Sequence, residues 1–343
     1  MSRFEHMNVL GSSRERGPRR LNLETLLSVE DLVRKEMYPL DPEDIGESIG
    51  ITPEEIEADM EYVRTTQDKI NRSNELARAI KEKKKELGEE ENNEISNYYE
   101  RLGHAFEGFL YSNISESKIF KDVILHKTAE YDDIKNGVDF VAEYKNPDDP
   151  KSYIALAMDA SLSMSTSLID KKIERSLKDI SHQQLSKVKY FQFEKDSPEA
   201  KLGMPRVVVG TDEDRVRQLL SRWNTKETIK DVEVSFEDDP VWTLMALQIN
   251  EQLQLFINQA KSHNQTELAN VCEKYQRSLE VSLRVNKDLV EKHRILMAQD
   301  GTSKAIKSYC EKITKEGLTS KSIHNESEQS RRDDEIFNKA IRA

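Results

Sequence analysis

The sequence predicts an α/β fold with a mixed central sheet flanked by helices and further helical segments at both ends. Apolar residues recur at three- and four-residue spacing over residues 95–114, as on one face of a helix. Between residues 123 and 158 they change to the alternating or continuous patterns of strands. Helical spacing returns after residue 168, and a strand-like run at 206–209 precedes another helix. This succession is typical of an α/β layer.

The composition indicates a modest core with exposed additions. The chain has 343 residues, which is enough for one sizeable core with helical extensions or for two small domains. Hydrophobic residues make up 36% and charged residues 34%, and the mean hydropathy is −0.75. A single compact globule would be less polar, so we expect long exposed helices or flexible ends.

Charge and cysteine content narrow the class of protein. The formal net charge of −12 argues against strong non-specific affinity for DNA, although a local basic face can still hold phosphate. Cys272 and Cys310 form no C-x-x-C pair, so neither a disulfide framework nor a zinc site is expected. No apolar run is long enough to span a membrane, and the N-terminus lacks the apolar core of a signal peptide. We therefore expect a soluble, cytoplasmic protein with no membrane partner.

Composition shifts divide the chain into five parts. A flexible basic arm, a helical N-terminal region, the α/β core, a C-terminal helical hairpin and a mobile polar tail are expected, at residues 1–20, 21–94, 95–235, 236–317 and 318–343. The helical termini could also contact protein partners or a second copy of the chain.

The N-terminal region carries a clear helix start. Thr52 is followed by Pro53 and Glu55, which supply an N-cap, a proline in the first turn and a capping carboxylate. The highly charged residues 65–95 predict a solvated helix that ends near Gly88.

Within the core, three strands are expected before the next helix. The first lies near residues 123–127, and the second, 138–144, is entered by a turn at 135–137. A loop at 146–150 leads to the third strand at 153–158, which is apolar enough to be buried on both faces.

After residue 168 the chain returns to helix, with a buried stripe at Ile169, Ile173, Leu177 and Ile180. Strands are expected at 188–193 and 206–209, and a helix beyond Val216. Residues 240–316 again have helical spacing, interrupted at Asp300-Gly301, which predicts a two-helix hairpin packed on the core.

Three acidic residues fall on successive elements of this core. Glu107 lies in the first helix, Asp139 in the second strand and Asp159 at the end of the third. Carboxylates in apolar surroundings are costly unless they are paired, hydrogen-bonded or bound to metal. If the three converge, their hard oxygen ligands suit Mg²⁺ or Mn²⁺.

The order of these acids resembles the PD-(D/E)XK nuclease superfamily. The segments that carry the likeness are 99–107, 131–141 and 154–159, and the likeness extends over about residues 98–224. In that pattern a helix glutamate precedes a β-hairpin that carries an aspartate, and the next strand carries an acid-x-lysine. The resemblance implies a restriction-endonuclease-like sheet in which Glu107, Asp139 and Asp159 hold one or two Mg²⁺ ions and catalyse hydrolysis of phosphodiester bonds in DNA or RNA.

The sequence departs from the pattern at one position. Ser161 stands two residues after Asp159, where the family carries a lysine that activates water and stabilises developing negative charge. Some branches of the superfamily move this lysine to the following helix, where Lys171 and Lys172 are candidates. At about 100° per residue, Lys172 flanks the buried stripe and Lys171 faces water, so we expect Lys172 to be the functional lysine.

Four further polar residues are weaker candidates. His104 and Glu100 lie about one and two turns before Glu107 and could share its face. His182 and Gln183 follow the later helix.

Three functions therefore stay open. The acids favour a nuclease, because clustered carboxylates without a cation would repel one another. Ser161 and the acidic net charge favour a catalytically inactive nuclease-like subunit that binds or supports a larger nucleic-acid-processing or viral assembly. A purely helical scaffold is the third, and the strand-like runs at 154–158 and 206–209 argue against it.

Overall fold

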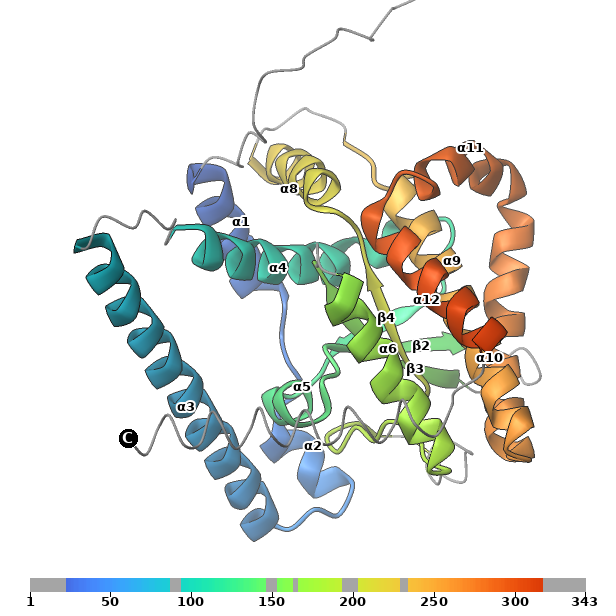
Figure 1. Ribbon diagram of the computed structural model, residues 1–343, viewed down its shortest axis with the longest axis horizontal. Helices are drawn as coiled ribbons and strands as arrows, with labels where there is room; N and C mark the ends of the chain where they lie inside the picture. The colour runs from blue at the N-terminus through green and yellow to red at the C-terminus, as the bar shows by residue number, and fades with distance from the viewer. Residues whose placement is uncertain are drawn as a thin grey trace, which may run out of the picture.

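The computed structural model describes residues 23–86, 94–145, 153–162, 166–192, 203–228 and 234–316. Within these ranges the chain forms helices around a mixed four-stranded sheet, which confirms the α/β class (Figure 1). The expected basic arm at 1–20, the polar tail at 318–343 and the loop at 146–150 lie outside the described residues. Among the described helices, none has the length and apolar character needed to cross a membrane.

The sheet contains β1 (Ile124–Lys127), β2 (Phe140–Lys145), β3 (Tyr153–Ser161) and β4 (Arg206–Gly210), in that spatial order. β1, β2 and β3 pair antiparallel, whereas β3 and β4 pair parallel. A parallel pair needs a crossover connection, and helix α6 (Thr166–Ser181) supplies it. β3 continues three residues beyond its expected end, so Asp159 lies within the strand and not at its end.

The central strands are buried on both faces. One face of β2 and β3 contributes to the main core through Phe140, Ala142, Tyr144, Ile154, Leu156 and Met158. The other face joins a smaller core made by Val138, Val141, Ala155, Ala157, Val188, Phe191 and Met204. This double coverage explains why the sequence of β3 is almost continuously apolar.

The turn expected at 135–137 is the end of a short helix, α5 (Glu130–Asn136). Gly137 closes this helix with φ +61°, and its N–H donates to the Asp133 carbonyl oxygen at 2.9 Å. Asp139 immediately precedes β2 and is not inside it, although its N–H donates to the Met158 carbonyl oxygen at 3.0 Å.

The strand expected at 188–193 is wrong over residues 188–192, and residue 193 is outside the described ranges. The N–H groups of Lys189 and Tyr190 donate to the Asp132 carboxylate, at 2.8 and 2.9 Å. These backbone donors are therefore satisfied by a side chain instead of a neighbouring strand.

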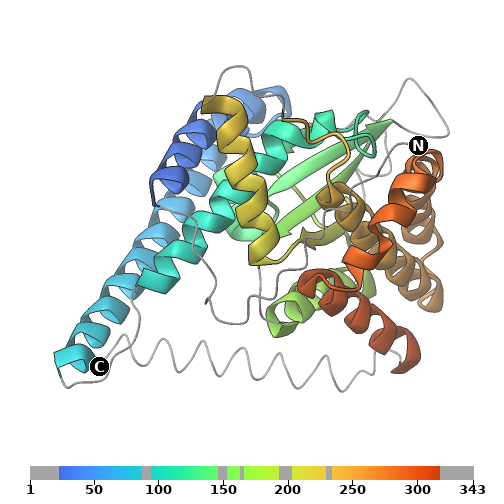
Figure 2. The same cartoon turned by 90° about the horizontal axis from the view of Figure 1, so that it is seen from above.

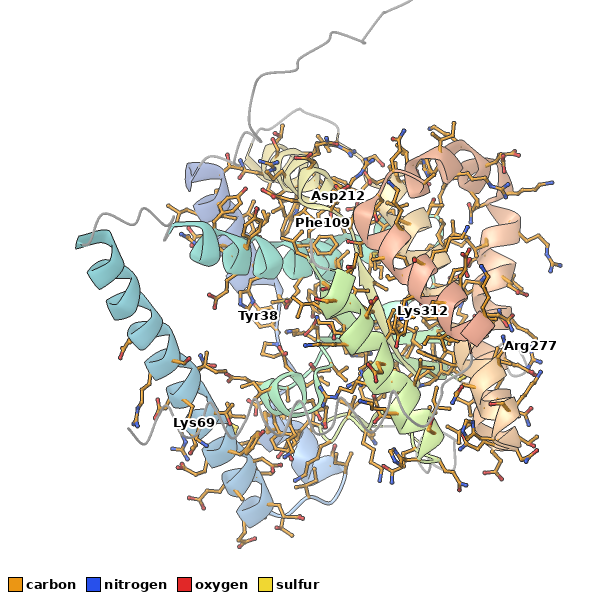
Figure 3. All side chains as sticks on the ribbon, in the orientation of Figure 1. Tyr38, Lys69, Phe109, Asp212, Arg277 and Lys312 are labelled. Atoms are coloured by element: carbon orange, nitrogen blue, oxygen red, sulfur yellow. The ribbon has the colours of Figure 1, made fainter. Side chains whose placement is uncertain are left out.

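Two helices complete the core beside the sheet. α4 (Glu94–Asn113) carries Glu107, and α8 (Glu213–Thr228) follows β4. Phe109 of α4, labelled in Figure 3, meets Trp223 of α8 edge-on at 5.9 Å and stacks on Trp242 at 5.6 Å. A short 3₁₀ turn, η1 (Ile114–Glu116), ends α4.

The N-terminal region forms α1 (Leu23–Glu36), α2 (Pro42–Ser48) and the long α3 (Pro53–Glu86). The capping box at Thr52 and Glu55 is present, with Glu55 N–H donating to Thr52 Oγ1 at 3.3 Å. α3 is anchored near its start, where Asp59 accepts from Tyr190 Oη at 2.7 Å, and its far end projects from the body (Figures 1 and 2).

The C-terminal region has more helices than the expected hairpin. α9 (Pro240–Ser262) and α10 (Thr266–Val285) form an antiparallel pair, and α11 (Lys287–Met297) and α12 (Gly301–Glu316) follow. The predicted break at Asp300 is confirmed, because its carboxylate caps α12 by accepting from Ser303 N at 2.6 Å.

Helix α9 also covers the open edge of β4. Gln252 accepts from Val208 N at 2.9 Å and donates to Val208 O at 2.7 Å. Gln248 makes the same two bonds with Gly210, at 3.0 and 2.8 Å. Two side chains one helical turn apart thus take the place of a neighbouring strand and fix the C-terminal helices to the core.

Candidate active site

Asp139 and Asp159 face each other across β2 and β3. The register pairs Phe140 with Met158, and one residue further along it sets Asp139 opposite Asp159. The two residues are 9% and 8% exposed, so water screens their charges poorly. Asp139 Oδ2 accepts a hydrogen bond from Ala160 N at 2.7 Å, which orients its carboxylate along β3.

Both aspartates resist ionisation. Burial raises the pKa of Asp139 well above its ordinary value, and the charges of Glu107, Asp159 and Asp133 raise it further. Burial also raises the pKa of Asp159, although the nearby Lys172 ammonium opposes this shift. Opposed carboxylates in a buried setting bind a proton or another cation more readily than isolated ones do.

Lys172 reaches this pair from helix α6. Its Nζ lies 2.6 Å from Asp159 Oδ1 and 3.5 Å from Ser161 Oγ. The ammonium therefore lies beside Ser161, the position at which the nuclease resemblance leads one to look for a lysine. The helical phase predicted this orientation, and Lys171 is exposed as expected.

Sequence reasoning missed two residues of the cluster, Lys127 and Asp133. Lys127 Nζ lies 3.2 Å from Glu107 Oε2 and 3.1 Å from Asp133 Oδ2. Burial lowers the pKa of Lys127, but the surrounding carboxylates outweigh this effect and raise it overall, so the side chain is charged. A lysine at an inward position of β1 was the available signal, whereas Asp133 lay in a segment assigned to no element.

Two of the three expected ligands remain available to a divalent cation. Within the described ranges, no three His, Cys, Asp or Glu side chains are grouped so as to hold a metal ion. Glu107, expected as a ligand, is instead engaged by Lys127. Asp139 and Asp159 still offer hard oxygen donors, and Mg²⁺ is often held by one or two carboxylates completed by water and substrate phosphate. The carboxylate oxygens of Asp139 and Asp159 are therefore suitable ligands for Mg²⁺.

A cleft of about 490 Å³ opens between α4 and α6, at the end of β3. Its walls include Tyr99, Glu100, Gly103, His104 and Glu107 from α4, Ala160, Ser161 and Leu162 from the end of β3, and Leu168, Lys171, Lys172 and Arg175 from α6. Glu100 and His104 thus share the face of Glu107, as expected.

His182 and Gln183 lie elsewhere. Both are exposed and follow the last residue of α6. They come about ten residues after Lys172, which corresponds to roughly 15 Å along a helix. They are therefore not part of the acidic cluster.

Comparison of the chain with protein-family models, with curated proteins and with solved structures found no match.

Proposed function

We propose that the chain is a nuclease of the PD-(D/E)XK type, with a restriction-endonuclease-like core, that hydrolyses phosphodiester bonds in DNA or RNA with Mg²⁺ or Mn²⁺. One observation carries this proposal. Lys172 Nζ lies 2.6 Å from Asp159 and beside Ser161, so a lysine from the next helix meets the acid that lacks its usual partner in the strand.

The acids and the lysine of the site would have different roles. Asp139 and Asp159 would hold the cation, with Glu107 available only if it leaves Lys127. A bound divalent cation would polarise the phosphoryl oxygen and lower the pKa of a water molecule. Lys172 lies at the cleft wall, where its ammonium can orient water and stabilise negative charge that develops on the phosphate.

The position of Lys127 favours a second candidate function: a nuclease-like subunit that binds nucleic acid or supports an assembly without cleaving. Its ammonium already pairs with both Glu107 and Asp133 and offsets part of their charge. Because Lys127 already reduces the repulsion among the carboxylates, the cluster depends less on a bound metal ion for stability than three unpaired acids would.

A cleavage assay decides between these candidates. The parent chain is incubated with single- and double-stranded DNA and RNA in Mg²⁺, Mn²⁺ or chelator, beside Asp159→Asn, Lys172→Met and the surface control Lys287→Met. We expect metal-dependent cleavage that falls about 10²–10³-fold in the first two variants, since each removes a group aimed at transition-state charge. Absence of cleavage, together with no metal-binding heat in calorimetry, would leave the inactive subunit as the function.

A further inference from the structure

Gly103 occupies an unusual place in the cleft wall. It lies in the middle of α4, is half-buried, and lines the space between α4 and α6. A Cβ built on it would meet no heavy atom within 4 Å, and its backbone is not in the left-handed region. Glycine weakens a helix interior, so a residue needed by neither packing nor backbone conformation calls for another reason.

Gly108, in the same helix, provides the contrast. A Cβ there would lie 2.1 Å from Val33 Cγ2, so this glycine is needed for α1 to pack on α4. The space beside Gly103 belongs instead to the open cleft. A glycine in that position lets a ligand lie directly against the helix backbone.

The opposite wall presents cations and apolar surface. Lys171 and Arg175 are exposed one turn apart on α6, and within the described part of the chain neither has a carboxylate at ion-pair distance. Arg175 Nη2 donates to the Lys135 carbonyl oxygen at 3.1 Å, which leaves its other N–H groups for a phosphate. Leu168, on the same wall, is 53% exposed, and Tyr99 lies across the cleft. The α4 wall carries Glu100 and Glu107, so the cleft is basic along its α6 side only. A row of cations beside aromatic and apolar surface is an arrangement that binds single-stranded nucleic acid, because phosphates pair with the cations and bases stack on the rings.

The size of the cleft selects for a single strand. Its volume of about 490 Å³ lies in the range of sites for small ligands, which suits a short stretch of nucleotides. A duplex is much larger than this cleft, because its major groove by itself is about 12 Å wide and admits an α-helix.

We propose that the cleft between α4 and α6 binds a single-stranded segment of nucleic acid. Its bases lie against α4 at Gly103, and its phosphates pair with Lys171 and Arg175 on α6, on the side of the cleft away from Glu100 and Glu107. The proposal rests on the proposed function, because the cleft leads to Lys172 and Ser161, yet it requires binding alone and not turnover. The chain has a net charge of −12, so phosphate is attracted only where cations gather locally, as Lys171 and Arg175 do at the rim of the cleft.

The test is fluorescence anisotropy with labelled oligonucleotides of about 12 nucleotides, single-stranded DNA, single-stranded RNA and duplex, in chelator so that nothing is cleaved. The variants are Gly103→Leu, which places a side chain in the cleft from a Cβ position that meets no heavy atom within 4 Å, and Lys171→Glu/Arg175→Glu. Lys287→Glu/Lys292→Glu on α11 is the matched control with the same charge change. Thermal unfolding of each variant verifies folding.

We expect tight binding of at least one single strand, weak binding of the duplex, and about ten-fold weaker binding in Gly103→Leu with an unchanged or higher Tm, since leucine favours helix. Loss of two phosphate contacts should also flatten the slope of log K against log salt by about 1.4. Equal binding of duplex, parent-like binding by Gly103→Leu and the α6 pair, or equal loss in the α11 control would each overturn the proposal. A parent that binds single strands but never cleaves with metal would refute only the proposed hydrolysis.

Discussion

Asp132 and Asp139 are both buried aspartates, on either side of Gly137, and they have opposite surroundings. Asp132 is fully buried, and its carboxylate accepts from Lys189 N, Tyr190 N and Asn136 Nδ2 at 2.7–2.9 Å. Asp139 accepts from Ala160 N but faces Asp159 and lies close to the charges of Glu107 and Asp133. Burial raises the pKa of both carboxyls, yet neutral donors surround the first and other acids surround the second.

This contrast separates a structural acid from a candidate functional one. Asp132 fastens residues 189–190 to α5, and its hydrogen bonds favour the charged form. Around Asp139 the interactions are largely repulsive, so folding has to bear their cost. Clusters of groups with perturbed pKa values beside a cleft are typical of functional sites.

The largest effect on stability should follow from removing the Lys127 ammonium from the acidic cluster. Lys127→Met leaves the half-buried Glu107 and Asp133 without a partner beside the buried Asp139, and should lower the free energy of unfolding by about 3–4 kcal/mol in chelator. Urea unfolding measures the change, and excess Mn²⁺ should recover more stability in this variant than in the parent. A loss below 1 kcal/mol would show that Lys127 does not balance the acids.

The second largest effect on stability should follow from removing the Asp132 carboxylate. Asp132→Ala leaves the buried N–H of Tyr190 and the part-buried N–H of Lys189 unpaired, and should lower the free energy of unfolding by about 3 kcal/mol. Asp132→Asn, which keeps one acceptor oxygen, should cost less. Both are followed by thermal unfolding, and Mg²⁺ should not restore either, whereas metal-dependent recovery would place Asp132 in the cluster.

Asp139→Asn should have the opposite sign and raise the free energy of unfolding by about 1–2 kcal/mol at pH 7. The folded-state pKa of Asp139 is raised, so the folded parent holds an extra proton between the unfolded value of about 3.9 and that raised pKa. The parent therefore loses stability as pH rises through this window, and the gain of the variant should vanish near pH 4. A pH-independent gain would contradict the electrostatic explanation.

The smallest effect on stability should come from Lys172→Met. The Lys172 side chain is 38% exposed, so solvent screens its pairing with Asp159 and the loss should stay below about 1 kcal/mol. Cleavage should nevertheless fall far more than in Lys287→Met. A variant that unfolds easily but retains its cleavage rate would make Lys172 a structural partner of Asp159.

The sequence by itself determined the local elements and the residues worth testing. Periodicity placed α4, β1, β3, β4 and α6 to within a few residues. The helical spacing of α6 also predicted correctly that Lys172 faces the acids and that Lys171 is exposed to water. These features depend on neighbours three or four residues away, or on burial of a whole strand, and both leave a regular pattern in the chain.

Tertiary structure alone decided how the charges are compensated. Asp132 holds backbone groups 57 and 58 residues away, which is why 188–192 forms no strand despite its composition. Lys127 pairs with Glu107 from a different element, so an expected metal ligand is already neutralised. Gln248 and Gln252 replace a strand at the edge of β4 from 38 and 44 residues further along. Such contacts join side chains to distant partners, and their energy depends on burial and geometry that no local periodicity encodes.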